Sequence, residues 1–149
     1  MGDSEASSAG DAPEPRRGTV FFVDDDDRLR TVTCRLLKAR GFEVLEAESA
    51  ERALDVLEKY EDDIHVVLMD INLPDGWGAS VAQRLRDVRP NMAVVFTTGY
   101  ADVDPILASA LNDAEFVVKK PFSTEQLVEI LERAIGGESE ESPGDTQAV

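Results

Sequence analysis

Short apolar runs alternate with segments of helical periodicity along most of the chain. The runs cover residues 19–23, 42–46, 64–69, 93–97 and 115–118. They are four to six residues long and rich in β-branched and aromatic side chains, which is typical of strands. The first, third and fourth runs are almost continuously apolar, which predicts strands of a parallel sheet with helices on both faces.

The segments between the runs repeat their apolar residues at intervals of three and four, which predicts helices that pack one face on a core. The expected core-facing residues are Leu29, Val32, Leu36 and Leu37 in the first helix, Ala50, Ala53, Leu54 and Leu57 in the second, and Leu127, Ile130, Leu131 and Ala134 in the last. A further helix is expected within residues 99–112, with Pro105 at its start.

Several residues mark the ends of these elements. Gly41 follows the first helix, and Ser123 with Gln126 forms a capping-box pattern before the last. Gly76 and Gly78 are expected in a turn that requires positive φ angles. These signals support the alternation of strands and helices.

Five strand-then-helix units within residues 19–135 predict one doubly wound α/β domain, a five-stranded parallel sheet with helices on both faces. Right-handed crossover connections favour the flavodoxin-like strand order 2-1-3-4-5. Residues 1–18 and 136–149 are rich in small and charged residues, so we expect both to be flexible tails, the second one acidic.

Acidic residues outnumber basic ones by 31 to 15, which gives a formal net charge of −16. This charge argues against binding to nucleic acid or to an anionic membrane surface, because both need clustered cations. The sequence has neither an apolar run of the ~20 residues needed to cross a bilayer nor a secretory signal pattern at its start. We therefore expect a cytoplasmic protein, and we expect its one cysteine, Cys34, to be a small buried side chain.

Acidic residues follow the two strands that flank the predicted switch in strand order. Asp24, Asp25, Asp26 and Asp27 come directly after the first strand, and Asp70 ends the third. Ligands bind at this place in doubly wound sheets, so carboxylates from both strands are expected to share one crevice. Because these carboxylates repel one another they call for a cation, and oxygen ligands alone favour Mg²⁺, with Mn²⁺ as a substitute.

A hydroxyl group and an ammonium group are expected at the same edge of the sheet. The fourth strand ends in Thr97, Thr98 and Gly99, and the fifth leads into Lys119 and Lys120. Carboxylates with a divalent cation, a hydroxyl and a lysine make a site for a phosphoryl group, because the cation and the lysine can neutralise its oxygens.

Four motifs thus occupy the strand ends in a fixed order. They are FVDDDDRLR after the first strand, VVLMDINLPDGWG around Asp70, VVFTTGYAD after the fourth strand and KKPFS after the fifth. Any one of them alone is a weak signal. Together, in this order and at this spacing, they closely resemble the receiver domain of two-component response regulators, the CheY-like family. The resemblance covers residues 19–135.

The resemblance implies a phosphoacceptor and a metal site. Asp70 matches the phosphoacceptor of the family, and Asp24 and Asp25 match its metal-binding acidic pair. These three carboxylates would bind Mg²⁺ together with the backbone carbonyl of Asn72, two residues after Asp70.

The resemblance also implies Thr98 as the family's hydroxyl, because a small residue follows it, and Lys120 as the family's lysine, because the next residue is a proline whose peptide bond is typically cis. One position departs from the family. Val117 stands three residues before the lysine, where receivers usually carry Tyr or Phe, and Phe116 is expected to point to the opposite face of the sheet. The switch that pairs the hydroxyl with an aromatic ring is therefore in question. Tyr100 and the backbone from the fourth helix to the fifth strand are two alternative carriers of the signal.

The implied function is that of a phosphorylated switch. A sensor histidine kinase or a histidine phosphotransfer protein would donate a phosphoryl group to Asp70, and the acyl phosphate would change the conformation of the domain until water hydrolyses it. The output would pass to a downstream effector protein or to a second copy in a phosphorylation-dependent dimer. We expect a stand-alone receiver or part of a larger hybrid protein, with no turnover of free substrates.

Two other functions stay open at this point. A receiver-like interaction module would keep the fold without phosphorylation, although the complete Asp, Thr and Lys set argues against it. A Mg²⁺-dependent aspartyl phosphatase would need a second acid where this chain has Asn72. Simpler interpretations hold for other residues: Asp26 and Asp27 would begin a helix, Lys119 would be exposed, and His65 would be an ordinary residue far from the site.

Overall fold

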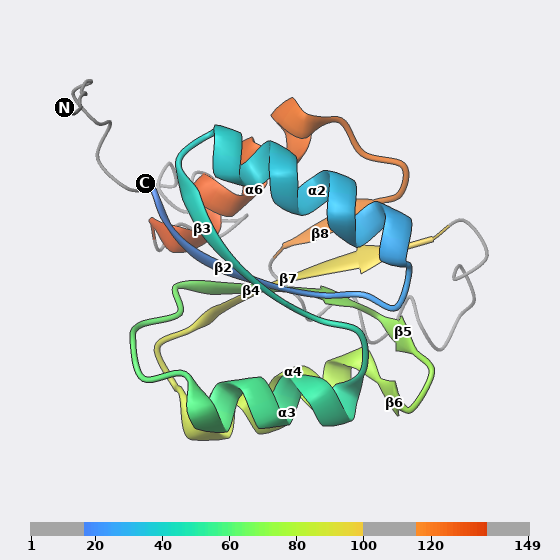
Figure 1. The fold of residues 1–149 in the computed structure, drawn as a ribbon, viewed down its shortest axis with the longest axis vertical. Helices are drawn as coiled ribbons and strands as arrows, with labels where there is room; N and C mark the ends of the chain where they lie inside the picture. Colours follow the sequence, from blue (N-terminus) through green and yellow to red (C-terminus); the bar gives the residue numbers. More distant parts are fainter. Residues whose placement is uncertain (1–16, 100–115, 137–149) are drawn as a thin grey trace, which may run out of the picture.

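Five parallel strands form the central sheet, in the spatial order β3-β2-β4-β7-β8 (Figure 1). The structure is a computed structural model that describes residues 17–99 and 116–136. The strands are β2 (Gly18–Val23), β3 (Phe42–Ala47), β4 (Val66–Asp70), β7 (Ala93–Thr98) and β8 (Val117–Lys119). Numbered along the chain, these five strands have the order 2-1-3-4-5, so the predicted flavodoxin-like topology is confirmed.

Within the described residues, two helices cover each face of the sheet (Figure 1). α2 (Asp27–Ala39) and α6 (Thr124–Ile135) lie on one face, and α3 (Ala50–Lys59) and α4 (Gly78–Val88) lie on the other. None of the helices in this part of the chain is long and apolar enough to span a membrane. The helix expected within residues 99–112 lies outside the described residues, apart from its first position.

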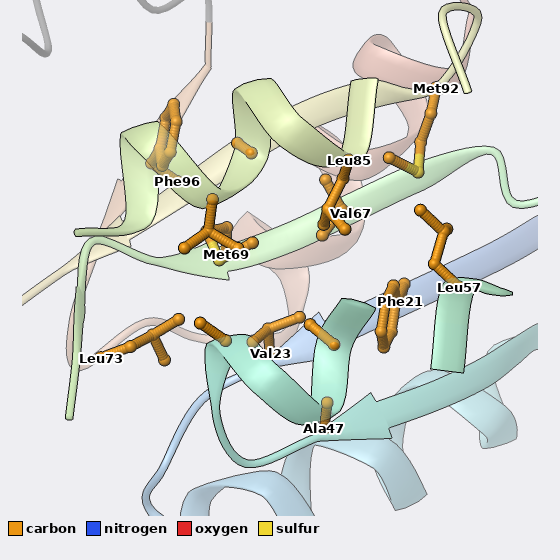
Figure 2. Packing of buried hydrophobic residues seen from close by; sticks show 14 of the residues in the cluster. Phe21, Val23, Ala47, Leu57, Val67, Met69, Leu73, Leu85, Met92 and Phe96 are labelled. Atoms are coloured by element: carbon orange, nitrogen blue, oxygen red, sulfur yellow. The ribbon is translucent and has the colours of Figure 1, made fainter. Parts of the chain in front are cut away.

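Each face of the sheet has its own hydrophobic core, because successive strand residues point to opposite faces. The core under α3 and α4 is drawn in Figure 2 and includes Phe21, Leu57, Met69, Leu85 and Met92. The core under α2 and α6 includes Phe22, Leu37, Leu68, Phe116 and Leu131. The central strands are buried on both sides, so their carboxyl ends are held in place by packing from two directions.

Every strand of the sheet differs from its predicted bounds by one or two residues, and β4 and β8 differ most. β4 begins at Val66 and not at residue 64, and β8 covers Val117–Lys119 where the pattern predicts residues 115–118. A short antiparallel pair, β5 (Asn72–Leu73) and β6 (Gly76–Trp77), follows β4 where only a turn is predicted. Strands of two residues are too short to show a hydrophobic period.

The predicted core face of α2 is wrong at two positions. Val32 is 55% exposed and Leu36 is 42% exposed, whereas Thr33, Cys34 and Leu37 are buried. The true core face is rotated by one residue, and the polar Thr33 within it hides the pattern. The expectation that Cys34 is a small buried side chain is confirmed.

Glycine is required at two positions for different physical reasons. Gly41 has a φ of 98°, as expected after a helix, but Gly76 and Gly78 lack the positive φ predicted for them. Gly78 instead begins α4, where a Cβ atom would lie 2.3 Å from the carbonyl oxygen of Asp70 and 2.7 Å from the Cα of Ile71. The missing side chain therefore lets α4 start directly against the end of β4.

Candidate functional site

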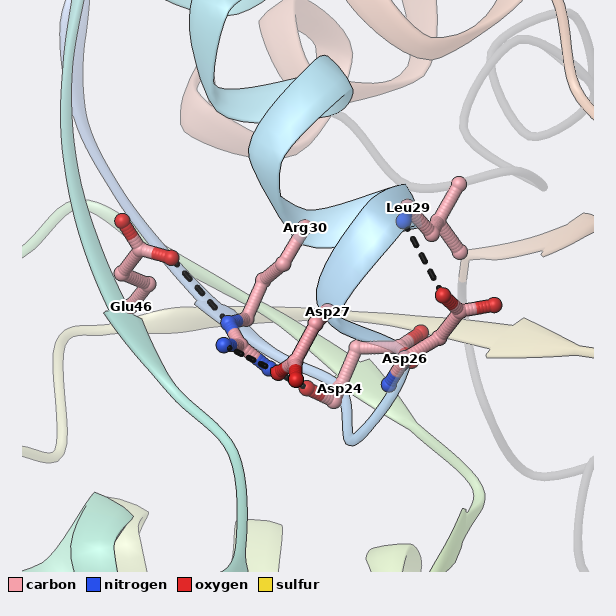
Figure 3. Close-up of polar contacts among 6 residues, drawn as sticks. All are labelled: Asp24, Asp26, Asp27, Leu29, Arg30 and Glu46. Atoms are coloured by element: carbon pink, nitrogen blue, oxygen red, sulfur yellow. Dashed lines mark hydrogen bonds and ion pairs between the residues drawn. The ribbon is translucent and has the colours of Figure 1, made fainter.

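The turn after β2 is organised by hydrogen bonds within its run of aspartates. Asp24 is fully buried, and its Oδ1 accepts a hydrogen bond from the main-chain N–H of Asp26 at 2.9 Å. Asp26 caps α2, because its Oδ1 accepts a hydrogen bond from the N–H of Leu29 at 3.1 Å (Figure 3). Asp27 is the first helical residue, where a negative charge interacts favourably with the helix dipole. The interpretation of Asp26 and Asp27 as a helix start is confirmed.

Three carboxylates converge at the carboxyl ends of β2 and β4. Asp70 is the last residue of β4, which pairs with β2 on one side and β7 on the other. One oxygen of each of Asp24, Asp25 and Asp70 lies within 4.8 Å of the others. Asp24 and Asp70 are buried and Asp25 is exposed, so the cluster is reached from solvent on the Asp25 side.

Lys120 reaches this cluster from the end of β8. Its Nζ lies 2.8 Å from Oδ2 of Asp24 and 3.4 Å from Oδ2 of Asp70. Its main-chain N–H donates a hydrogen bond to the carbonyl oxygen of Thr98 at 2.8 Å, which joins the lysine to the end of β7. The peptide bond between Lys120 and the following proline is cis. The ends of β2, β4 and β8 thus supply side chains to one small region, and β7 is joined to Lys120 through the main chain.

Burial and charge both act on the titration of this cluster. Removal from water and the negative charge of Asp24 raise the pKa of Asp70 to about 6, although Lys120 and the N–H of Asn72 favour its ionised form. At Lys120, burial alone would lower the pKa, but the hydrogen bonds and charges of Asp24 and Asp70 outweigh it and raise the pKa. Lys120 is therefore an ammonium at neutral pH, and ionised Asp70 calls for further positive charge.

The cluster has the donor set of a hard divalent cation. Oδ2 of Asp24 is buried and has the Nζ of Lys120 as its ion-pair partner at 2.8 Å. One ammonium cannot offset the charge of three carboxylates that lie so close together, so a further cation is favoured at the cluster. The candidate ligands Asp24, Asp25, Asp70 and Asn72 all offer oxygen, which favours Mg²⁺ or Mn²⁺ over softer metals. The residues present therefore fit such a cation.

The two threonines at the end of β7 are both buried but differ in position. Thr97 lies opposite Asp70 in the sheet register, and its Oγ1 has no hydrogen-bond partner among residues 17–99 and 116–136. Thr98 is the last residue of the strand and lies opposite Lys119, whose side chain is exposed as expected. The main chain of Thr98 is tied to Lys120, whereas the role of its hydroxyl stays a prediction.

Phe116 and Val117 point to opposite faces of the sheet, as predicted. Phe116 is buried in the core under α2 and α6, and Val117 packs against the core under α3 and α4. No ring of this strand therefore stands on the face where the family resemblance would place it, and Tyr100 lies outside the described residues.

His65 precedes β4, at the opposite end of that strand from Asp70, and its Nδ1 accepts a main-chain hydrogen bond at 3.0 Å.

Two residues near the site make contacts that the sequence motifs do not indicate. The Arg30 side chain donates a hydrogen bond to the main-chain carbonyl of Asp24. The Asp75 carboxylate accepts hydrogen bonds from the N–H groups of Ala50 at 2.8 Å and Glu51 at 3.1 Å, which lower the pKa of Asp75. Asp75 thereby ties the loop after β4 to the N-terminus of α3. Both contacts depend on side-chain directions that residue spacing alone does not show.

The fold and the cluster together define a receiver-type signalling domain, and comparison with known families agrees. Residues 20–132 match the family described as the response regulator receiver domain. The match covers more than half of the chain, and the chain therefore belongs to this family.

The chain is similar to parts of larger proteins and to a solved receiver domain protein. The sensor kinase CckA of Brucella abortus is 34% identical over 110 residues, which are 73% of this chain and 12% of that protein. The DNA-binding transcriptional regulator NtrC of Escherichia coli K12 is 30% identical over 120 residues, which are 80% of this chain and 25% of that protein. A CheY-like receiver domain protein from Methanospirillum hungatei superposes with a TM-score of 0.72 at 25% identity, covering 80% of this chain and 94% of that one. The chain thus spans a quarter or less of these two curated relatives and nearly all of a solved receiver domain.

Proposed function

We propose that this chain is a phosphoacceptor receiver in which Asp70 takes a phosphoryl group from a phosphohistidine. The donor would be a sensor histidine kinase or a histidine phosphotransfer protein. The observation that carries the proposal is the meeting of Asp70 with Asp24, Asp25 and Lys120 at the end of the central strands. Membership of the receiver family and the similarity to a sensor kinase and a transcriptional regulator support it.

Asp70 supplies the nucleophile. One of its ionised carboxylate oxygens would attack the phosphorus, and an O–P bond would form as the P–N bond to the donor histidine breaks and its electron pair stays on the imidazole. Lys120 contacts both Asp24 and Asp70, so its ammonium is placed to neutralise the phosphoryl oxygens during the transfer. A bound Mg²⁺ or Mn²⁺ would add the positive charge that the phosphoryl oxygens and the ionised carboxylates require.

The acyl phosphate would then be read by the neighbouring strand ends. We assign the Thr98 hydroxyl the role of binding a phosphoryl oxygen. Because Val117 has no ring to move, the change would travel through the main-chain hydrogen bond that joins Thr98 to Lys120. The output would go to an effector protein or to a second copy of the chain, and hydrolysis of the acyl phosphate by water would reset the domain.

Labelling by a small phosphodonor tests this function without the unknown kinase. The purified protein is incubated with acetyl phosphate in millimolar Mg²⁺ or in EDTA, and its intact mass is recorded. We expect one added phosphoryl group with Mg²⁺, none with EDTA, and none in Asp70→Asn. Asp26→Asn removes a neighbouring carboxylate that caps α2, and it should be labelled like the wild type.

The assay also separates the proposal from its rival. A wild-type protein that stays unlabelled in Mg²⁺ would overturn the proposal and favour an interaction module without phosphorylation. An Asp70→Asn variant that is labelled as fully as the wild type would show that the acceptor lies elsewhere.

A further inference from the structure

We propose that Arg30 is a positioning residue of the cation site, and that the site depends on the shape of its guanidinium group more than on its charge. The inference rests on the proposed function, because it requires that Asp24, Asp25 and Asp70 bind a divalent cation. Arg30 is not itself a ligand. It acts through the backbone that carries two of the ligands.

The guanidinium of Arg30 makes contacts with three different residues, Glu46 on one side and Asp27 and Asp24 on the other (Figure 3). Nη1 donates a hydrogen bond to the main-chain carbonyl oxygen of Asp24 at 2.7 Å. Nε donates to Oε1 of Glu46 on β3 at 3.0 Å, and Nη2 donates to Oδ1 of Asp27 at 2.8 Å. The Arg30 side chain is only 14% exposed, whereas Asp27 is 84% exposed and Glu46 is 47% exposed. The contact with the Asp24 carbonyl is therefore the one that is partly shielded from water.

These contacts fix the turn that carries the acidic pair. The main-chain N–H of Asp24 donates a hydrogen bond to the carbonyl oxygen of Ala47 on β3 at 3.1 Å. The carbonyl of Asp24 is held through Arg30 to Glu46 on the same strand. Both peptide groups of Asp24 are thus tied to β3, and the second of them is the peptide that joins Asp24 to Asp25. Groups that orient the ligands of a metal in this way contribute strongly to its affinity.

The positive charge of Arg30 would lower the affinity for a metal, whereas its contacts would raise that affinity. A positive charge near the cluster repels a divalent cation, so loss of that charge alone would strengthen metal binding. The charge is, however, paired with the carboxylates of Asp27 and Glu46, which offset its field at the cluster. We therefore expect the loss of positioning to outweigh the loss of repulsion when Arg30 is replaced.

Three variants separate the two effects. Arg30→Met keeps the apolar stem and removes all three contacts. Arg30→Lys keeps the charge, but a single ammonium group cannot reproduce a planar fork that binds in three directions. Arg28→Met is the matched control, because it removes the same charge from an exposed position two residues earlier.

Titration calorimetry with Mg²⁺, repeated with Mn²⁺, measures the affinity of each variant. We expect the Kd to rise about tenfold in Arg30→Met and nearly as much in Arg30→Lys, as for other groups that orient metal ligands. Arg28→Met should stay close to the wild type. At saturating Mg²⁺, labelling of Arg30→Met by acetyl phosphate should approach the wild-type extent, because the ligands themselves are intact.

Several outcomes would overturn the inference. Metal binding by Arg30→Met that equals or exceeds the wild type would do so, and full recovery in Arg30→Lys would show that charge alone matters. Thermal unfolding in EDTA reports whether each variant folds. If Arg30→Met does not fold, Glu46→Ala removes the acceptor on β3 and should weaken metal binding by a smaller factor. A wild-type protein that binds neither cation would reject the proposed function itself.

Discussion

Replacing Asp70 by asparagine should stabilise the protein when no divalent cation is present. In the folded protein, burial and the charge of Asp24 raise the pKa of Asp70 from 3.8 to about 6, so its ionised form is less favourable than in the unfolded chain. Asparagine removes this charge and keeps an oxygen that can accept the hydrogen bond from the N–H of Asn72. Lys120 also keeps its nearer partner, Asp24, at 2.8 Å.

The size and pH dependence of the effect follow from the pKa of Asp70. A shift of about two pKa units corresponds to about 3 kcal/mol at most. Solvent screening and the lost contact with Lys120 reduce this value, so we expect the free energy of unfolding to rise by about 1 to 2 kcal/mol near pH 7.5. Because the folded-state pKa lies above the unfolded one, the folded wild type binds more protons between about pH 4 and 6. Its stability should therefore rise as the pH falls through about 6, and this rise should shrink in Asp70→Asn.

Urea unfolding in EDTA, at pH values on both sides of 6, measures these differences. Addition of Mg²⁺ should stabilise the wild type by mass action, and the variant should lose most of that response. Asp63→Asn, an exposed change before the start of β4, serves as the control and should behave like the wild type in both buffers. An Asp70→Asn variant that is less stable than the wild type in EDTA would refute the view that the ionised carboxylate is disfavoured in the folded state.

Three further predictions concern residues around the site. Gly78→Ala should lower the free energy of unfolding by about 3 kcal/mol in urea, because its Cβ would meet the Asp70 carbonyl oxygen at 2.3 Å, and a neutral result would contradict the close packing of α4. Asp75→Ala should cost about 1 kcal/mol by removing the bonds to the N-terminus of α3. Since the folded-state pKa of Asp75 is lowered, the ionised carboxylate stabilises the protein at neutral pH, and this stabilisation should fade as the pH falls through that pKa. A difference in stability between Asp75→Ala and the wild type that does not change with pH would contradict this role of the carboxylate. Thr97→Val should leave the free energy of unfolding unchanged or raise it by up to about 1 kcal/mol, because its buried hydroxyl has no hydrogen-bond partner in the described part of the chain. A clear loss of stability would show that the hydroxyl makes a stabilising hydrogen bond.

The fold could be predicted because two hydrophobic periods alternate along the chain. Strands β2, β4 and β7 are buried on both faces and appear as continuous apolar runs, and right-handed connections leave few ways to order them. The face of α2 was harder to predict, because the buried Thr33 is polar and the exposed Val32 and Leu36 are apolar. Apolar spacing alone cannot separate two faces that differ by one residue.

The site could be predicted as far as the backbone topology determines it. Strand ends that meet at one edge of a parallel sheet bring Asp24, Asp70 and Lys120 together whatever the details of packing. The need for glycine at residue 78 follows instead from the short distance between α4 and the end of β4, which the local sequence pattern does not indicate. The contacts of Arg30 likewise depend on how its side chain turns back toward β3.

The decisive measurement of the proposed function is the identity of the residue that carries the phosphoryl group. Wild-type protein labelled with acetyl phosphate in Mg²⁺ is treated with borohydride, which reduces an acyl phosphate to an alcohol, and its peptides are analysed by mass spectrometry. We expect a reduced side chain at Asp70 and at no other position. Reduction at Asp24 or Asp25 in place of Asp70, or recovery of Asp70 unchanged from labelled protein, would contradict it.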